Sequence, residues 1–413
     1  MAADSGSAQC AASKPTLRLL AESHIQNCAT KETGGSYFSS AQWTADGTCL
    51  LATSSEQVVS TFVLPTDLLD QREQPQDLSP EASVQLPEPT QAIAGAPYFS
   101  LAEPPSQLFL AACRDHPLQI RHARSEDPHA APLAIYKLIK TETEAYIAPS
   151  SLMWEHPGTH FICGSMNRLD YFDVQRAGSD GPFLTIPTGP SRANRSKGYS
   201  IGMKGYISAL ASTKPDQHGC SILAAGTRTR WVGMYDIHRT DKAIANWAIS
   251  GKDGLSNDMD TEGRGVVQLK WSPCGRYLVV NERRANGLLV YDIRGSGRLL
   301  GVLGGRSLNT QQRLSCDVFA GDTNHDTSFE VWAGCEDGSV KVWDHVGKHE
   351  GLTEPSWDWK AHESPVSGTM LHSSGSVVAT CSGAWGYPNG VESDDTPRAK
   401  VMEESSLKLW AIS

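Results

Sequence analysis

The chain lacks the features that mark a membrane-spanning or a secreted protein. None of its apolar runs approaches the roughly 18 residues that a membrane-spanning helix needs. Residues 1–13 are small and polar, without the basic start and the apolar core of a secretory signal. The 10 cysteines are scattered, with no C-x-x-C pair and no Cys/His grouping at metal-binding spacing. We therefore expect an intracellular protein whose cysteines are reduced and structural.

Signatures of catalysis are also missing. The chain carries no Walker motif, no nucleophile elbow and no paired carboxylates that suggest a reaction. The glycine-rich stretch 295–301 has the wrong spacing for a dinucleotide-binding loop. Two histidine pairs, His156 with His160 and His345 with His349, are interrupted by turn residues, so neither presents two imidazoles on one helical face. We expect no enzyme, no cofactor, no metal site and no small-molecule substrate.

The net charge of −10 excludes a globally basic surface. A nucleic-acid partner would therefore have to meet a local basic patch, because the protein as a whole repels phosphate. The positions of the arginines consequently matter more than their number.

What the chain does contain is a repeat. Seven times a short apolar stretch ends in an aromatic residue or its stand-in, and within each stretch apolar and polar residues alternate. Period-two alternation marks half-buried strands, and a recurrence of about 50 to 67 residues matches the blades of a degenerate WD-repeat propeller. The seven stretches are 59–62, 118–122, 169–173, 232–236, 288–292, 340–344 and 407–410. The sequence therefore predicts an all-β fold, a seven-bladed WD-repeat β-propeller.

A propeller accounts for nearly the whole chain as one closed domain, because each blade buries its faces on its neighbours. We expect residues 17–413 to form it, after a disordered segment at 1–16. The acidic, proline-rich segment 65–92 is expected to be an exposed loop without a core. The second blade is expected from about 98 to 136, and 389–405 is expected to be a loop in the last blade.

The two ends of the repeat are complementary. The last unit, 407–410, has the place of a third strand, which leaves its blade without an outer strand. The apolar run 17–22 precedes the first blade and has no blade of its own. We expect this N-terminal strand to complete the last blade, because closing the ring removes an open edge that would invite aggregation.

Basic residues recur at equivalent positions of successive blades. In a four-stranded blade the turn between strands two and three lies on the same face as the loop between blades, so residues there converge on one surface. Arginine pairs bidentately with phosphate, and single-stranded RNA also needs aromatic platforms for its bases. The RNA-binding candidates are Arg168, Arg192, Arg195, Lys197, Lys204, Arg228, Arg230, Trp231, Arg283, Arg284, Gln312 and Arg313. Further aromatic residues beside these loops are Tyr199, Trp385 and Tyr387.

Structural roles compete with this interpretation. The alternative for Arg230 is that it pins a turn by bonding backbone carbonyls, and the alternative for Trp231 is packing between blades. Acidic neighbours at Asp115, Glu282 and Glu336 would partly cancel a basic face.

Four motifs, in order along the chain, carry a resemblance to a known family. They are W-x-x-D-G-x-C from Trp43, G-S/T-x-x-R-x-L/V-G-x-Y from Gly226, T-x-Q-R-x-x-x-D from Thr310, and A-T-x-S-G from Ala379, followed by an aromatic-Pro pair. With them the chain resembles the telomerase Cajal body protein family, WD-repeat proteins that bind small nuclear RNAs, over nearly the whole propeller. It departs from the family pattern at Gly164, where G-x-N-R is one residue out of step.

The resemblance implies a non-enzymatic, RNA-binding subunit of small nuclear or Cajal body ribonucleoproteins. Such a protein would bind a short loop motif in a small Cajal body or telomerase-type RNA and direct the nuclear localisation of that RNA. The implied partners are this RNA and other ribonucleoprotein subunits, and the implied location is the nucleus, with some protein in the cytoplasm. A protein–protein scaffold, for example in pre-mRNA splicing, is the alternative, because propellers serve many unrelated roles.

Overall fold

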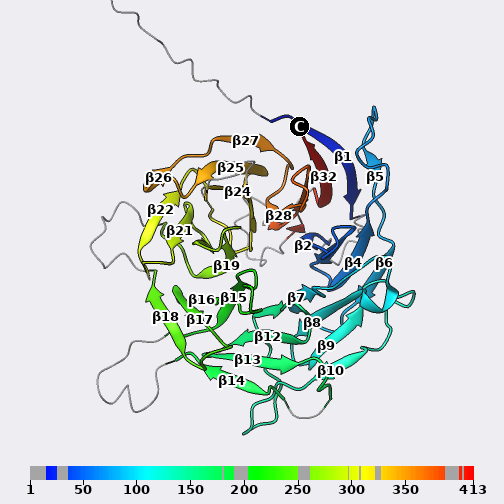
Figure 1. Cartoon of the computed structure of the whole chain (residues 1–413). Coiled ribbons are helices and arrows are strands. Elements are labelled where there is room, and N and C mark those ends of the chain that lie inside the picture. The colour runs from blue at the N-terminus through cyan, green and yellow to red at the C-terminus, as the bar shows by residue number, and fades with distance from the viewer. Residues whose placement is uncertain are drawn as a thin grey trace, which may run out of the picture.

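The computed structural model describes residues 15–25, 36–178, 181–189, 203–249, 261–295, 297–306, 308–320, 327–386, 400–401 and 404–413. Within these ranges helix is limited to one 3-10 turn, η1 (Pro104–Ser106). The strands of the described residues form seven blades around a common axis (Figure 1) and one separate two-stranded ladder. The predicted all-β, seven-bladed propeller is therefore confirmed.

The first three blades each contain four antiparallel strands. Blade 1 consists of β2 (Phe38–Trp43), β3 (Cys49–Ser54), β4 (Val58–Val63) and β6 (Ala82–Gln85). Blade 2 consists of β7 (Thr90–Gly95), β8 (Leu108–Cys113), β9 (Leu118–His122) and β10 (Ala134–Tyr136). Blade 3 consists of β11 (Ser151–Trp154), β12 (His160–Ser165), β13 (Arg168–Asp173) and β14 (Leu184–Pro187). In blades 1 and 2 the first strands, β2 and β7, lie nearest the axis (Figure 1).

Blades 4 to 6 repeat this plan. Blade 4 consists of β15 (Ile207–Ser212), β16 (Leu223–Thr227), β17 (Trp231–Tyr235) and β18 (Ala243–Ala248). Blade 5 consists of β19 (Val266–Trp271), β20 (Tyr277–Glu282), β21 (Leu288–Asp292) and β22 (Leu299–Leu303), and β26 (Gly351–Thr353) adds a parallel fifth strand. Blade 6 consists of β23 (Cys316–Phe319), β24 (Phe329–Gly334), β25 (Ser339–Val346) and β27 (Trp357–Lys360).

Blade 7 joins the two ends of the chain. It orders β28 (Val366–Leu371), β29 (Val377–Ser382), β32 (Ser406–Ile412), β1 (Leu17–His24) and β5 (Gln76–Asp77). β1 lies antiparallel to β32 from Leu17 opposite Ile412 to His24 opposite Ser406 (Figure 1). The predicted N-terminal closing strand is therefore confirmed. A separate two-stranded ladder pairs β30 (Trp385–Gly386) with β31 (Lys400–Val401). β30 precedes the segment 389–405, and β31 lies within it.

The acidic segment 65–92 differs from the core-free loop expected from its composition. It supplies the outer strand of blade 1, a short strand of blade 7 and the start of β7, and it buries Leu78 and Leu86. Blade 2 accordingly begins at Thr90 and not near Tyr98. Outer strands need only one apolar face, so a few leucines and valines among acidic residues suffice, and the composition hides them.

Apolar surfaces are buried between neighbouring blades. Second strands lie in the middle of their sheets and are covered on both faces, and every residue of β20 and β29 is buried. Between blades 2 and 3, Tyr136, Phe161 and Phe172 pack with ring centroids 4.9 to 6.0 Å apart. These inter-blade contacts fix each blade's loops relative to those of the next, because interiors of this kind are close-packed.

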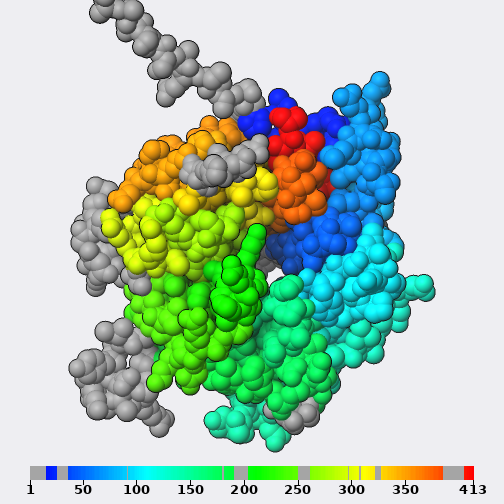
Figure 2. Space-filling view, in the orientation of Figure 1, coloured from blue at the N-terminus to red at the C-terminus, as the bar shows by residue number. Residues whose placement is uncertain are grey.

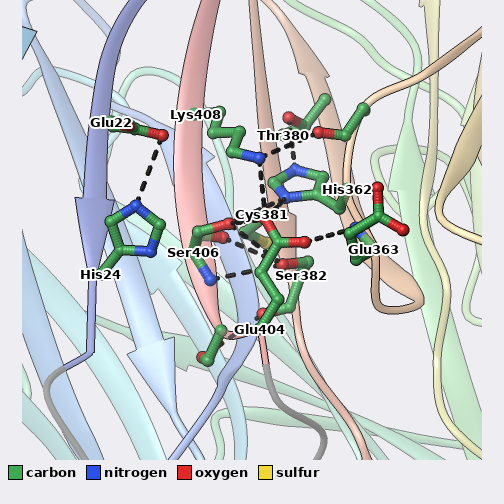
Figure 3. Close-up of polar contacts among 12 residues, drawn as sticks. Glu22, His24, His362, Glu363, Thr380, Cys381, Ser382, Glu404, Ser406 and Lys408 are labelled. Carbon is green, nitrogen blue, oxygen red and sulfur yellow. Dashed lines mark hydrogen bonds and ion pairs between the residues drawn. The ribbon is translucent and has the colours of Figure 1, made fainter. Parts of the chain in front are cut away.

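A hydrogen-bonded network inside blade 7 links its strands to the preceding loop (Figure 3). Trp410 Nε1 donates to Thr380 Oγ1 at 2.9 Å, and Thr380 Oγ1 lies 2.8 Å from His362 Nε2. On its other side, His362 Nδ1 lies 2.9 Å from Ser406 Oγ and 3.2 Å from Glu404 Oε1. Burial lowers the pKa of His362, so the ring is neutral at neutral pH.

A cavity of about 810 Å³ runs along the axis, lined mainly by first strands. The space-filling view shows the face of the molecule hollowed at the centre of the ring (Figure 2). Inside the cavity, Lys270 Nζ lies 2.8 Å from Asp317 Oδ1, which balances the charge of both groups. Polar and apolar side chains line this cavity in similar measure, and we call it the axial channel.

Candidate nucleic-acid interface

One face of the disc collects the turns between second and third strands together with the loops between blades. Backbone bonds join the two kinds of segment directly: Arg228 N donates to Tyr206 O at 3.0 Å, and Arg264 N donates to Arg283 O at 2.7 Å. Asn167 N likewise donates to Gly205 O, which joins blade 3 to blade 4. We call this the turn face. The RNA-binding candidates that the structure describes lie in these turns and loops or directly beside them.

Three of the arginines gather at the channel mouth on the turn face. Arg228 and Arg313 line the axial cavity. Burial, together with the nearby positive charges of Arg283 and Arg228, lowers the pKa of Arg313 to about 10. Burial and the charge of Arg228 also lower the pKa of Arg283. Gly265 lies against the backbone of Arg228 and accepts the Arg283 N–H at 2.9 Å, so the backbones of Arg228 and Arg283 are neighbours. We call Arg228, Arg283 and Arg313 the axial arginines.

The loop before β23 reaches across the channel mouth. Gln312 Nε2 donates to Gly383 O of blade 7 at 2.7 Å. The next residue, Arg313, donates from Nη2 to Ser150 O of blade 3 at 3.3 Å, so two consecutive side chains contact blades on different sides of the ring. The hydrogen bond of Gln312 to Gly383 gives this predicted RNA-binding residue a structural role as well.

Tyr206 is an aromatic platform that the sequence analysis did not select. Its ring is 45% exposed, and the Arg228 guanidinium lies over it at 5.4 Å from the centroid. An isolated bridge pairs Tyr206 with Met166 of blade 3, which is 55% exposed. A signal existed, because Lys204-Gly205-Tyr206 and Arg264-Gly265-Val266 both place a basic residue and a glycine before a first strand. Arg264, which is exposed, carries the same signal and was also not selected.

Two candidate arginines are neutralised by buried carboxylates. Arg168 Nε lies 2.8 and 3.0 Å from the oxygens of Asp170, a fully buried side chain. Arg230 contacts Glu282 of the next blade through Nε and Nη2 at 2.9 and 3.0 Å, and Glu282 is 1% exposed. Arg230 also has a positive φ of 62° at its turn. These pairs give both arginines a structural role; for Arg230 the described partner is the Glu282 carboxylate of the next blade, where the structural alternative expected backbone carbonyls.

The remaining candidates have mixed placements. Trp231 is half-buried and packs against the apolar cluster of blades 3 and 4. Lys204 is exposed on the turn face, and Arg284 is half-buried beside Arg283. Outside the described residues lie Arg192, Arg195 and Lys197, together with Tyr199 and Tyr387.

The acidic neighbours of the turn face are occupied. Glu282 is paired with Arg230, and Glu336 accepts a hydrogen bond from the backbone of Asn309 at 2.6 Å. Asp115 lies 3.4 Å from Arg114, and both side chains are exposed. None of these carboxylates pairs with an axial arginine.

In the part of the chain that the structure describes, no three His, Cys, Asp or Glu side chains are grouped so that they could hold a metal ion. The described residues also contain no helix long and apolar enough to cross a bilayer.

Fold and site together define a class: a seven-bladed propeller of the WD-repeat type, with a basic channel mouth on its turn face. No family model matches the chain. The chain is 26% identical over 382 residues to human telomerase Cajal body protein 1, covering 89% of this chain and 62% of that protein. The bovine protein of the same name is 25% identical, covering 89% of this chain and 64% of its own length.

A relative with a different name matches as well. The "Guanine nucleotide-binding protein negative regulator 1" of Schizosaccharomyces pombe is 26% identical over 315 residues, covering 74% of this chain and 70% of its own length. The resemblance to the telomerase Cajal body proteins, inferred from four motifs, is confirmed. The chain spans less than two thirds of the length of the human and bovine proteins.

Proposed function

We propose that this protein is a non-enzymatic, RNA-binding subunit of small nuclear or Cajal body ribonucleoproteins and that it binds RNA through the turn face. The observation that carries the proposal is the group of axial arginines. A protein of net charge −10 has gathered three guanidinium groups where, among the described residues, no carboxylate is paired with them. The relatives named for telomerase and Cajal bodies support an RNA partner and a nuclear location.

The arrangement suits looped RNA for physical reasons. Phosphate contacts from arginine fix the register of a strand, while stacking and base-edge contacts carry specificity. Arginine at the channel mouth and the exposed Tyr206 supply both kinds of contact side by side. The ring holds the contributing loops in fixed relative positions, since each blade is packed on its neighbours.

Crosslinking in cells followed by sequencing of the bound RNA tests this proposal. We expect enrichment of small nuclear or Cajal body RNAs, with crosslinks concentrated at one loop motif. The Arg228→Gln variant should recover much less RNA, because it removes a cation of the turn face. Arg239→Gln is the matched control, since Arg239 is exposed in the turn between strands three and four of blade 4, on the opposite face. No RNA above background with the unmodified protein would contradict the proposal.

A protein–protein scaffold, for example in pre-mRNA splicing, is the second candidate. The name of the S. pombe relative, a regulator of a guanine nucleotide-binding protein, favours it. Affinity purification would separate the two: a scaffold retains its protein partners after ribonuclease treatment and in the Arg228→Gln variant, whereas partners held through RNA are lost in both.

A further inference from the structure

The axial arginines differ from three arginines that have structural roles in the described part of the chain, Arg306, Arg168 and Arg230. Arg306 shows the structural pattern: it is completely buried, and its three nitrogens donate to Gly334 O at 2.8 Å, Asn281 Oδ1 at 2.9 Å and Leu314 O at 3.0 Å. Arg168 and Arg230 are saturated in another way, by carboxylates. In these three arginines the guanidinium groups are held by protein acceptors.

Arg313, in contrast, makes one hydrogen bond, at 3.3 Å to Ser150 O, and otherwise lines the axial cavity. Arg228 is exposed on the same lining and contacts the face of Tyr206. Arg283 makes no side-chain hydrogen bond or ion pair with the described residues. Most donors of the axial arginines therefore point at no protein acceptor within the described ranges.

Placing three like charges together is costly in free energy unless an anion completes the group. The cost is larger where water is partly excluded, as it is for the half-buried Arg283 and Arg313. A phosphate group fits best, because its several oxygens accept from more than one guanidinium fork, and paired N–H groups match them bidentately. A halide offers no such directed acceptors.

We propose that Arg228, Arg283 and Arg313 form a phosphate-binding site at the channel mouth and that Tyr206 stacks the base adjacent to the bound phosphate. The inference rests on the proposed function for its RNA ligand, although free polyphosphate shares the phosphate chemistry. We assign the base to Tyr206 because its exposed ring adjoins Arg228, so that the phosphate and the base of one nucleotide can contact Arg228 and Tyr206 together. Arginine over an aromatic ring is also an arrangement that extends a stack.

Two probes test the site on the full-length protein. Pyrophosphate, followed by thermal shift and calorimetry, reports the phosphate site alone, and a labelled single-stranded RNA of about 15 nucleotides reports phosphate and base together. We expect Arg228→Gln and Arg283→Gln each to abolish the pyrophosphate-induced shift and to reduce the slope of log affinity against log salt for RNA by about 1. Arg239→Gln should behave like the unmodified protein in both assays.

Tyr206 is tested separately. Tyr206→Ala should weaken RNA binding about tenfold, leaving pyrophosphate binding and the salt slope unchanged, because stacking involves no released counterion. Tyr206→Phe should restore the affinity, since the ring and not the hydroxyl does the stacking. Equal loss in both variants would overturn the base-stacking part.

The outcomes distinguish this inference from the proposed function. RNA binding with a slope unchanged in both arginine variants would leave the proposed function standing and overturn the phosphate site. Pyrophosphate binding that is lost in the variants, with no binding of RNA at low salt, would support the phosphate site and contradict the proposed function. Binding of neither probe would overturn both.

Discussion

Individual arginines of the turn face differ in what holds them: a carboxylate of the same strand, a carboxylate of the next blade, or, for the axial arginines, no described carboxylate. Arg168 is paired with Asp170, two residues along the same strand, and this i, i+2 relation on one sheet face was readable from the sequence. Arg230 is paired with Glu282 from the next blade, 52 residues away, and no local pattern reveals such a contact. Tyr206 was missed although the basic residue and glycine that precede it, Lys204 and Gly205, are visible in the sequence. Sequence therefore located the turn face but could not separate its paired cations from its axial arginines.

Replacement of Arg306 tests the structural role at this scale. Arg306→Met should lower the free energy of unfolding by about 3 kcal/mol or more, because it leaves buried acceptors on Gly334, Asn281 and Leu314 without donors. Chemical denaturation measures the change. Arg264→Gln, exposed on the turn face, should change stability by less than about 0.5 kcal/mol. A neutral Arg306→Met would show that this hydrogen-bonded group does not stabilise the ring.

The main feature at the scale of elements is the pairing of the N-terminal strand β1 with the C-terminal strand β32. The unpaired third strand and the orphan N-terminal run predicted the closure, because both signals are local apolar alternations. The outer strand β6 and the two-residue β5 escaped prediction, since an acidic, proline-rich composition outweighed the buried Leu78 and Val84. Short outer strands depend on the blade to which they are added more than on their own sequence.

Deletion of residues 1–26 tests the closure. The truncated protein should lose roughly 5 kcal/mol of stability, from the ladder with β32 and the burial of Leu20 and Ala21. It should also associate through the exposed edge of β32. Light scattering after size exclusion measures the association, and thermal unfolding measures the stability. Deletion of 1–14 alone, which leaves β1 intact, is the control; equal behaviour of the two deletions would contradict the closing role.

The blade 7 network predicts how stability depends on pH. Burial lowers the pKa of His362 below its ordinary 6.5. Burial alone would raise the pKa of Glu404, but hydrogen bonds from His362, Lys408 and the Glu363 backbone lower it well below 4.5. Both folded-state pKa values are depressed, so the stability they give is present above the unfolded values and is lost as pH falls.

We therefore expect the unfolding free energy to decline as pH falls below 6.5 through His362, and again below 4.5 through Glu404. Urea unfolding at intervals between pH 7.5 and pH 4 measures it. His362→Gln removes the titrating ring but keeps an amide that can bond Thr380 and Ser406, so the decline just below pH 6.5 should disappear in that variant. A decline of the same size in both proteins would assign it to other groups.

The whole molecule is a ring whose symmetry brings distant segments to one mouth. The repeat predicted the number of blades and the face, because propeller geometry assigns turns to faces whatever their sequence. It could not predict that the loop before β23 crosses the mouth and brings Arg313 within hydrogen-bonding distance of Ser150, 163 residues earlier. Through this crossing Arg313 lines the same cavity as Arg228, and the account of function depends on it.

The salt dependence of RNA binding tests that central claim most directly. Affinity for a looped small nuclear RNA fragment, measured by fluorescence anisotropy across a salt series, should fall log-linearly for the unmodified protein, because bound phosphates release counterions. The double variant Arg228→Gln/Arg283→Gln should bind more weakly, with a slope smaller by about 2, whereas Arg239→Gln should match the unmodified protein. Identical slopes in all three proteins, or no binding at low salt, would contradict the account.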